Sequence, residues 1–110
     1  MSTTKSADGS AIDREYLRRA TLGDPALERE LLSMFQSQIA EARARLAETD
    51  GSERGRIAHA VKGAARGLGA FEIANCAAEI ERFPGDERLI GQFAVLADRI
   101  DAAIRVLSAE

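Results

Sequence analysis

The chain has 110 residues, which is enough for one domain with a modest hydrophobic core. Hydrophobic residues make up 45% and charged residues 30%, an ordinary globular balance, and the net charge of −3 argues against nucleic-acid binding. Aromatic residues are only 5%, there are two prolines, and helix-favouring Ala, Leu, Arg and Glu are abundant. We therefore predict an all-α protein.

The chain lacks the marks of a secreted or membrane-bound protein. No apolar run approaches the roughly 18 residues that a membrane span needs, and the N-terminus carries no hydrophobic signal segment. The single cysteine, Cys76, cannot form an internal disulfide, and its position on a helical stripe predicts a small core residue. We expect a cytoplasmic protein that does not bind membranes.

The N-terminal region divides into a tail and a short helix. Residues 1–9 are small and polar and are predicted to be disordered. A helix is predicted to begin at Ser10, with Asp13 in a weak capping-box position. The helical domain is accordingly expected over residues 10–110. The residues of the short helix that are spaced to cover one end of a bundle are Ile12, Tyr16, Leu17 and Ala20.

Four longer helices follow, and turn or capping residues mark each break between them. Connections of about two to four residues force neighbouring helices to run antiparallel. This pattern predicts an up-down-up-down four-helix bundle, with the short N-terminal helix across one end. The four helices are predicted from Pro25 (cap Asp24) to about Glu48, from Asp50 or Ser52 to Gly67–Gly69, from about Phe71 to Pro84, and from Asp86 onward.

Each long helix carries an apolar stripe at helical spacing, and these stripes predict the core. The opposite face of the first long helix, with Gln36 and Arg43, is expected to be solvated. The stripe of the last helix could also serve a dimer, but packing within the bundle is the simpler interpretation. Outside the second helix, the predicted core comprises Leu27, Leu31, Phe35, Ile39, Ala42, Leu46, Ile73, Cys76, Ala77, Ile80, Phe83, Leu89, Ile90, Phe93, Leu96, Ile100, Ile104 and Leu107.

The second long helix carries the only histidine of the chain, His59. This residue lies roughly 140–200° around the helix from the apolar stripe, so we expect it to face water. The row at four-residue spacing on its own face reads Gly55, His59, Gly63, Gly67. Glycine inside a helix costs about 1 kcal/mol relative to alanine, and here it leaves the imidazole open to a large partner. The stripe itself consists of Ile57, Val61, Ala64 and Leu68.

Three cations, Arg56, Lys62 and Arg66, lie near His59 along this helix. A histidine of ordinary pKa, about 6.5, is largely neutral at pH 7, and nearby cations disfavour its protonated form. Neutral imidazole is a nucleophile, and the same cations, Arg66 among them, could give a phosphoryl group electrostatic support. The sequence contains no Walker-type phosphate loop, zinc-ligand spacing or Ser–His–Asp pattern. A lone surface histidine is often only a surface residue, so these patterns alone leave both interpretations open.

The stretch His59–Ala70, HAVKGAARGLGA, resembles the phosphorylation motif of histidine-containing phosphotransfer (HPt) domains, roughly H-x-[LV]-K-G-[SA]-[SA]-x-x-[LIV]-G-[AL]. It matches every specified position, and the resemblance extends over most of the chain. The resemblance implies a four-helix bundle with an additional N-terminal helix, acting in two-component signal transduction. Such a domain is a phosphocarrier between receiver-domain aspartates, and it has no ATP-dependent kinase activity of its own.

The resemblance also implies roles for individual residues. His59 would accept the phosphoryl group through Nε2, Lys62 would balance its charge, and Gly63 would leave room for the incoming receiver. Glu81 would help to orient the site rather than contact the phosphoryl group, because a carboxylate repels it. The partners would be response-regulator receiver domains or hybrid histidine kinases. The chain would need no cofactor of its own, since the receiver supplies Mg²⁺, and we expect a monomer.

Three alternatives stand beside a stand-alone phosphocarrier. The chain could be one domain of a larger hybrid sensor kinase. It could be a non-phosphorylated docking module that regulates a receiver domain, although such a module has no need of His59 and Lys62. A dimeric histidine-kinase core would require an ATP-binding domain, for which the chain has no length. Partner specificity is expected in the surface around His59, including Gln36, Arg43, Arg56 and Arg66.

Overall fold

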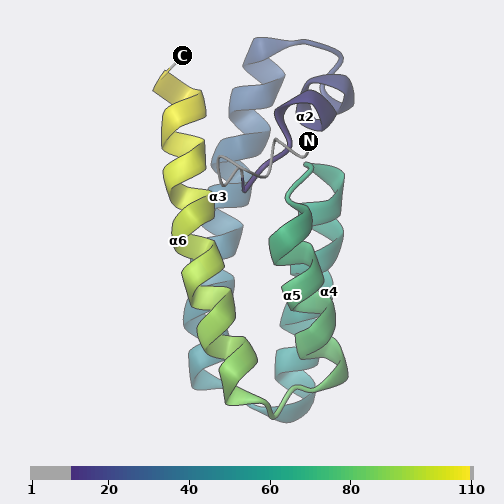
Figure 1. Ribbon diagram of the computed structural model, residues 1–110, viewed down its shortest axis with the longest axis vertical. Helices are drawn as coiled ribbons and strands as arrows, with labels where there is room; N and C mark the ends of the chain where they lie inside the picture. The colour runs from purple at the N-terminus through teal and green to yellow at the C-terminus, as the bar shows by residue number, and fades with distance from the viewer. Residues whose placement is uncertain (1–10, 110) are drawn as a thin grey trace, which may run out of the picture.

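The computed structural model describes residues 11–109, which form five α-helices and no strand (Figure 1). The all-α prediction is confirmed. Among the same residues, no helix combines the length and the apolar character needed to cross a bilayer. The predicted tail, residues 1–9, and the predicted helix start at Ser10 lie outside the described residues. The helices are α2 (Arg14–Ala20), α3 (Pro25–Glu48), α4 (Gly51–Gly67), α5 (Phe71–Arg82) and α6 (Glu87–Ala109).

The four long helices form an antiparallel bundle (Figure 1). Contacts join α3 to α4, α4 to α5, α5 to α6, and α6 back to α3. The helices therefore follow one another around the bundle in chain order, and α4 and α6 occupy diagonally opposite corners. This diagonal arrangement separates the outward face of α4 from the outward face of α6.

The short helix α2 lies at the end of the bundle where α4 ends and α5 begins (Figure 1). The backbone N–H of Asp13 donates to the carbonyl oxygen of Gly69 at 2.9 Å, and the Tyr16 ring meets Phe71 edge-on with centroids 5.1 Å apart. Gly69 has φ +82°, and a Cβ there would lie 3.0 Å from the Asp13 carbonyl oxygen. A glycine at this position thus allows both the turn after α4 and the close approach of α2.

Capping side chains set most of the helix starts. Asp24 accepts hydrogen bonds from the backbone N–H groups of Ala26 and Leu27, with Pro25 in the first turn of α3. Asp86 caps α6 in the same way. These predicted boundaries are confirmed. Residues 11–13, which were predicted to be helical, are not, and Asp13 caps a helix that begins at Arg14.

The core agrees with most of the predicted stripes, including Phe35 and Phe93 at 2% and 1% exposure. Two predicted core residues are exposed. Leu27 lies in the first turn of α3, which is longer than α4 and extends past its end. Phe83 is the residue after the last turn of α5, so it leaves the helical stripe, and the Arg82 guanidinium covers its ring. Ala20, expected to cover the bundle end, is also exposed.

Two buried side chains, the thiol of Cys76 and the guanidinium of Arg54, are not simple apolar core residues. Cys76 is buried as predicted, and burial raises the pKa of its thiol to about 11. Arg54 on α4 is only 4% exposed, although it is charged, because the helical period places it on the same face as Ile57 and Val61. Its guanidinium donates to the carbonyl oxygens of Leu46 and Pro84, both at 3.0 Å, and pairs with Glu87 at 2.9 Å. Arg54 thereby ties α4 to the end of α3 and to the α5–α6 connection.

Candidate functional site

Helix α4 has two faces of opposite character. Its inward face buries Ile57, Ala58, Val61 and Ala65 against the neighbouring helices. His59 lies on the outward face, and its side chain is 71% exposed. The prediction that His59 faces water is confirmed, and the solid bundle behind it holds the ring on a rigid element.

The glycines of the His59 row leave open space beside the ring. A Cβ built at Gly55, Gly63 or Gly67 would meet no atom within 4 Å. None of these three residues has a positive φ, so the backbone does not demand glycine at these positions. The row is therefore a surface that lacks side chains, and a large partner can approach His59 along it.

Helix α5 places a carboxylate against this site. Glu81 Oε2 lies 2.7 Å from Nδ1 of His59, and Oε1 lies 2.5 Å from Nζ of Lys62. Because α5 runs antiparallel beside α4, it brings Glu81 next to a histidine 22 positions earlier in the chain. Glu81 and Lys62 are largely covered, with side chains 25% and 21% exposed, whereas His59 is open. The Glu81 carboxylate thus contacts both His59 and Lys62, the histidine and the lysine of the HPt-like motif.

The contact with Glu81 orients the imidazole ring. An ionised carboxylate only accepts hydrogen bonds, so the nitrogen facing it carries the proton. In neutral His59 that nitrogen is Nδ1, and the lone pair is left on Nε2. The geometry therefore favours the tautomer in which Nε2 carries the free lone pair.

The charges around the imidazole of His59 differ from the prediction that cations surround it. Lys62 is paired with Glu81, and Arg56 is paired with Glu53 at 2.8 Å. Hydrogen bonds from Lys62 and then from His59 hold the pKa of Glu81 below its ordinary value, so this carboxylate is ionised at neutral pH. The charged group that contacts the imidazole is thus the carboxylate of Glu81. The nearby cations Lys62 and Arg56 pair with carboxylates and do not contact the imidazole.

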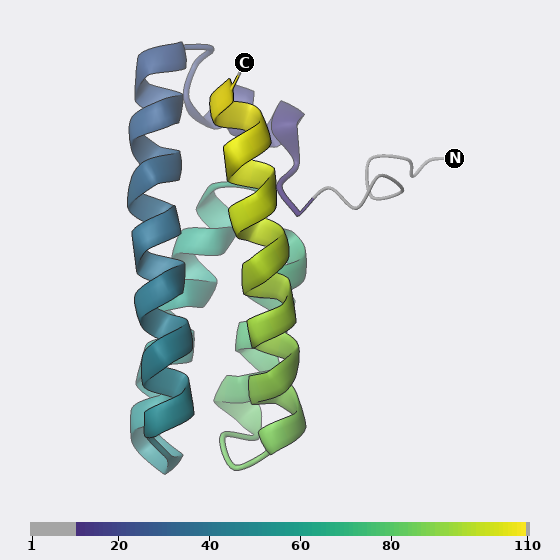
Figure 2. The same cartoon turned by 90° about the vertical axis from the view of Figure 1, so that its left-hand side faces the viewer.

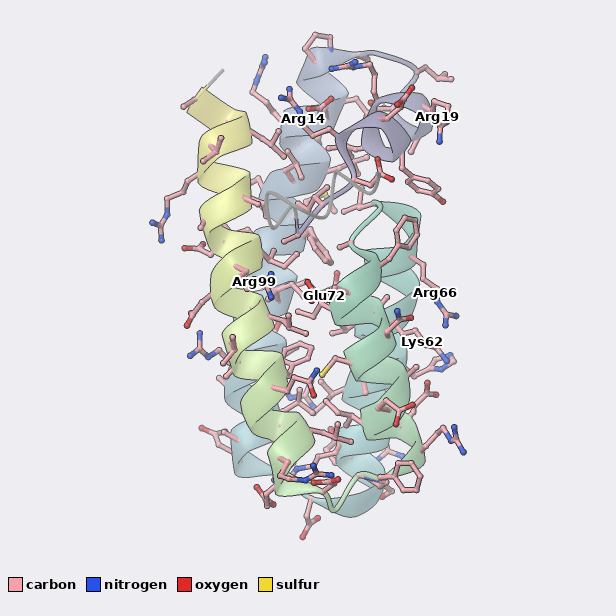
Figure 3. The ribbon with its side chains drawn as sticks, viewed as in Figure 1. Arg14, Arg19, Lys62, Arg66, Glu72 and Arg99 are labelled. Atoms are coloured by element: carbon pink, nitrogen blue, oxygen red, sulfur yellow. The ribbon has the colours of Figure 1, made fainter. Side chains whose placement is uncertain are left out.

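Arg66 lies on the same outer flank of the bundle as Lys62 (Figure 3). It is exposed on α4, two turns beyond His59, and within residues 11–109 no hydrogen bond or ion pair joins it to the histidine. Any support that Arg66 gives to an anion at His59 therefore acts through its charge rather than through contact with the ring.

Gln36 and Arg43, expected around His59, lie elsewhere. Gln36 donates to Asp101 and Arg43 pairs with Asp98, each at 2.5 Å, across the seam between α3 and α6. That seam lies on the other side of the bundle from the α4–α5 seam, as the helix contacts require. The expectation that these two residues belong to the surface around His59 is therefore wrong.

A groove between α3 and α4 borders the glycine row on the side away from Glu81. Met34, on its rim, is 62% exposed. The helical stripes did not predict this groove, because it depends on how α3 and α4 pack together. Its lining comprises Leu31, Met34, Phe35, Gln38, Gly63, Ala64, Gly67 and Leu68.

A comparison with protein-family models identifies one match. The model for the Hpt domain matches residues 29–109, which include α4, α5, α6 and nearly all of α3. The short helix α2 lies before the matched region. No curated protein and no solved structure matches the chain.

Proposed function

The chain belongs to the Hpt domain family, and from this premise we propose that His59 is its phosphoacceptor. Hpt domains are phosphocarrier modules rather than kinases, and they act with receiver domains and kinases in two-component phosphorelays. In our proposal, His59 takes a phosphoryl group from the aspartate of one receiver domain and passes it to the aspartate of another.

The observation that carries this proposal is the 2.7 Å contact between Glu81 and Nδ1 of His59. A neutral imidazole with its proton on Nδ1 offers the lone pair of Nε2 to an incoming phosphorus atom. The open row at Gly63 and Gly67 supports the proposal, because in-line transfer requires the partner's aspartate to come close to the ring.

The proposed step forms one bond and breaks one bond. The Nε2 lone pair attacks the phosphorus atom, and an N–P bond forms. The bond from phosphorus to the aspartyl oxygen breaks, and its electron pair returns to the receiver's carboxylate. The ring then carries a positive charge with the proton still on Nδ1, where the Glu81 carboxylate stabilises it. Delivery to the second receiver reverses these events.

Lys62 is proposed to balance the charge of the phosphoryl group. In the unphosphorylated protein it is paired with Glu81 at 2.5 Å, so it would move from this carboxylate to a phosphoryl oxygen. Gly63 gives the receiver room, and Arg66 supports the anion by its charge. The chain itself needs no cofactor in this proposal, because the receiver domain supplies Mg²⁺.

The test is transfer of a phosphoryl group from a phosphorylated receiver domain to this protein. A panel of purified receiver domains would be phosphorylated with acetyl phosphate and Mg²⁺, cleared of donor, and mixed with the wild type or with His59→Gln. We expect acid-labile, base-stable phosphate on the wild type alone, with the same helical circular dichroism for both proteins.

Two other results would overturn the proposal. Receivers that bind the wild type without transferring label would indicate a non-phosphorylated docking module. Label from ATP alone, or label that persists in His59→Gln, would show a different activity or a different acceptor.

A further inference from the structure

The groove between α3 and α4 is an apolar hollow on the outside of the bundle. It offers about 340 Å³, and among the described residues its lining includes no charged side chain and one polar one, Gln38. Phe35, 2% exposed, lies at its base, and Met34, 62% exposed, lies on its rim. Figure 2 shows α3 along one edge of the bundle with α4 passing behind it. The volume is at the lower end of the roughly 300–1,000 Å³ of ligand pockets, so it suits one or two side chains of a partner.

Gly67, the last residue of α4, keeps one side of this groove open. Its φ is not positive, and a Cβ there would meet no atom within 4 Å, so neither the backbone nor close packing demands a glycine. Clearance next to the imidazole does not demand it either. Gly55 and Gly63 lie one helical turn to either side of His59, whereas Gly67 lies about 12 Å along the helix. The HPt-like motif leaves position 67 unspecified, so the missing side chain is a feature of this chain.

The position of the groove indicates what covers it. Its lining includes Gly63, which lies about 6 Å along α4 from His59. A standard interface takes about 800 Å² from each partner, the area of a disc of roughly 16 Å radius. A receiver domain that brings its aspartate to Nε2 of His59 therefore lies over the groove as well. This identification of the partner rests on the function proposed above.

The two sides of His59 offer the receiver different chemistry. On the α5 side lie the paired charges of Lys62 and Glu81. On the α3 side, a charged group that entered the groove would lose water and find no opposite charge in the lining. An apolar side chain would instead bury its surface there against Met34, whose flexible thioether adapts to different shapes. The groove therefore favours a leucine, isoleucine, methionine or phenylalanine of the partner.

We propose that this groove is a specificity pocket that takes one apolar side chain of the receiver domain, from the surface beside its phosphorylated aspartate. Met34 supplies a wall of the pocket, and Gly67 leaves the space that the side chain enters. Neither residue contacts the reacting atoms, so both act on docking and not on the transfer step. A receiver with a charged side chain at the matching position is rejected by the cost of removing water from that charge.

Single-turnover transfer from phosphorylated receivers would test the pocket. The rate of His59 labelling would be measured against receiver concentration for the wild type, Met34→Asp and Gly67→Leu, with circular dichroism to check folding. Both changes should raise the concentration that gives half the maximal rate by about tenfold and leave the maximal rate within about twofold. Met34→Leu should behave like the wild type. Val106→Asp is the matched control and should change neither value, since Val106 is also 62% exposed but lies on α6.

Three results would overturn the pocket. The first is an unchanged half-maximal concentration for Met34→Asp and Gly67→Leu. The second is an equal rise for Val106→Asp, which would mean that any exposed acid weakens docking. The third is a lower maximal rate at an unchanged half-maximal concentration, which would place Met34 and Gly67 in the transfer step.

Binding measurements separate this inference from the phosphocarrier proposal. Isothermal titration of unphosphorylated receivers into His59→Gln measures docking without transfer, and adding Met34→Asp should weaken that binding by about tenfold. If binding weakens in this way but no receiver labels the wild type, the pocket stands and the phosphocarrier proposal fails. If receivers label the wild type and Met34→Asp alters neither labelling nor binding, the phosphocarrier proposal stands and the pocket fails. Receivers that neither bind nor label would contradict both.

Discussion

The two faces of α4 use similar residues for different purposes. On the inward face, the Arg54 guanidinium is 4% exposed and bonds to two backbone carbonyls and a carboxylate. On the outward side, Lys62 pairs with Glu81, which also contacts the exposed ring of His59. Both cations neutralise an acid, but only the second acid touches an exposed imidazole ring. Charge pairing alone therefore does not distinguish the two faces, whereas the exposed histidine beside Glu81 does, and there we place the proposed phosphoacceptor.

The comparison predicts that inward changes affect folding and outward changes affect phosphotransfer. Phe93→Ala, in the core that supports the inward face, should lower the free energy of unfolding by about 3–5 kcal/mol. Urea unfolding followed by circular dichroism would measure this loss. Gln92→Ala, the exposed neighbour, is the control and should change stability by no more than about 0.5 kcal/mol. Equal losses would mean that Phe93 is not a core residue.

Arg54→Met should lower the free energy of unfolding by about 2–3 kcal/mol, because it leaves buried carbonyl oxygens without donors. Arg56→Met is the matched control two residues away, where an exposed arginine pairs with Glu53 and, among residues 11–109, with no other acid. We expect that variant to stay within about 0.5 kcal/mol of the wild type. Chemical denaturation of both variants under the same conditions would separate the two faces of the helix.

Gly63→Leu should reduce the rate of transfer from a phosphorylated receiver by about 100-fold, because a side chain would keep the receiver from in-line distance. The same change should raise the free energy of unfolding by about 0.5–1 kcal/mol, since leucine favours a helix more than glycine does. Gly63→Ala should show a smaller loss of rate. A normal rate for the leucine variant would show that the receiver does not approach along the glycine row.

Lys62→Ala should slow transfer by about tenfold, the effect of losing roughly one charge contact to the phosphoryl group. Stability should change by less than about 1 kcal/mol, because Lys62 lies at the edge of the bundle with a partly exposed carboxylate partner. Lys62→Arg keeps the charge and should recover most of the rate. If the alanine and arginine variants were equally slow, the role of Lys62 would depend on its shape and not on its charge.

Glu81 should add a small pH dependence to stability. Its folded pKa is lowered from an ordinary value of 4.5, so its contribution is complete above that value and is lost as pH falls through the depressed folded pKa. Glu81→Gln should flatten this part of the curve. Urea unfolding at a series of pH values between 7 and 3 would compare the slopes, and identical slopes would show that the Glu81 contacts do not persist in solution.

Most of the fold could be read from local patterns. Caps such as Asp24 and Asp86 and the stripes around Phe35 and Phe93 set the helices and the core, because they depend on residues close together in the chain. Two residues predicted to be buried are exposed. Leu27 lies where one helix extends past its neighbours, and Phe83 lies where the helix has ended. The exposure of these two residues depends on the relative lengths and the ends of the helices, which an apolar stripe in the sequence does not predict.

The candidate site was only partly predictable. The exposure of His59 and the open row at Gly63 follow from helical periodicity and were confirmed. The direct contact of Glu81 with Nδ1 depends on the register between α4 and α5, which one sequence does not specify. The helical period places Arg54 on the apolar face of α4, but the carbonyl acceptors of Leu46 and Pro84 that make its burial possible leave no signal in the side-chain pattern.

The most direct test of the proposed mechanism is a ¹⁵N NMR measurement of the imidazole ring of His59, before and after phosphorylation by a phosphorylated receiver domain. His59 is the only histidine, so its two ring nitrogens can be assigned without ambiguity. We expect the neutral ring to carry its proton on Nδ1, and the phosphorylated ring to carry phosphorus on Nε2. A proton on Nε2 in the free protein, or phosphorus on Nδ1 after transfer, would contradict the orienting role of Glu81 and the mechanism that depends on it.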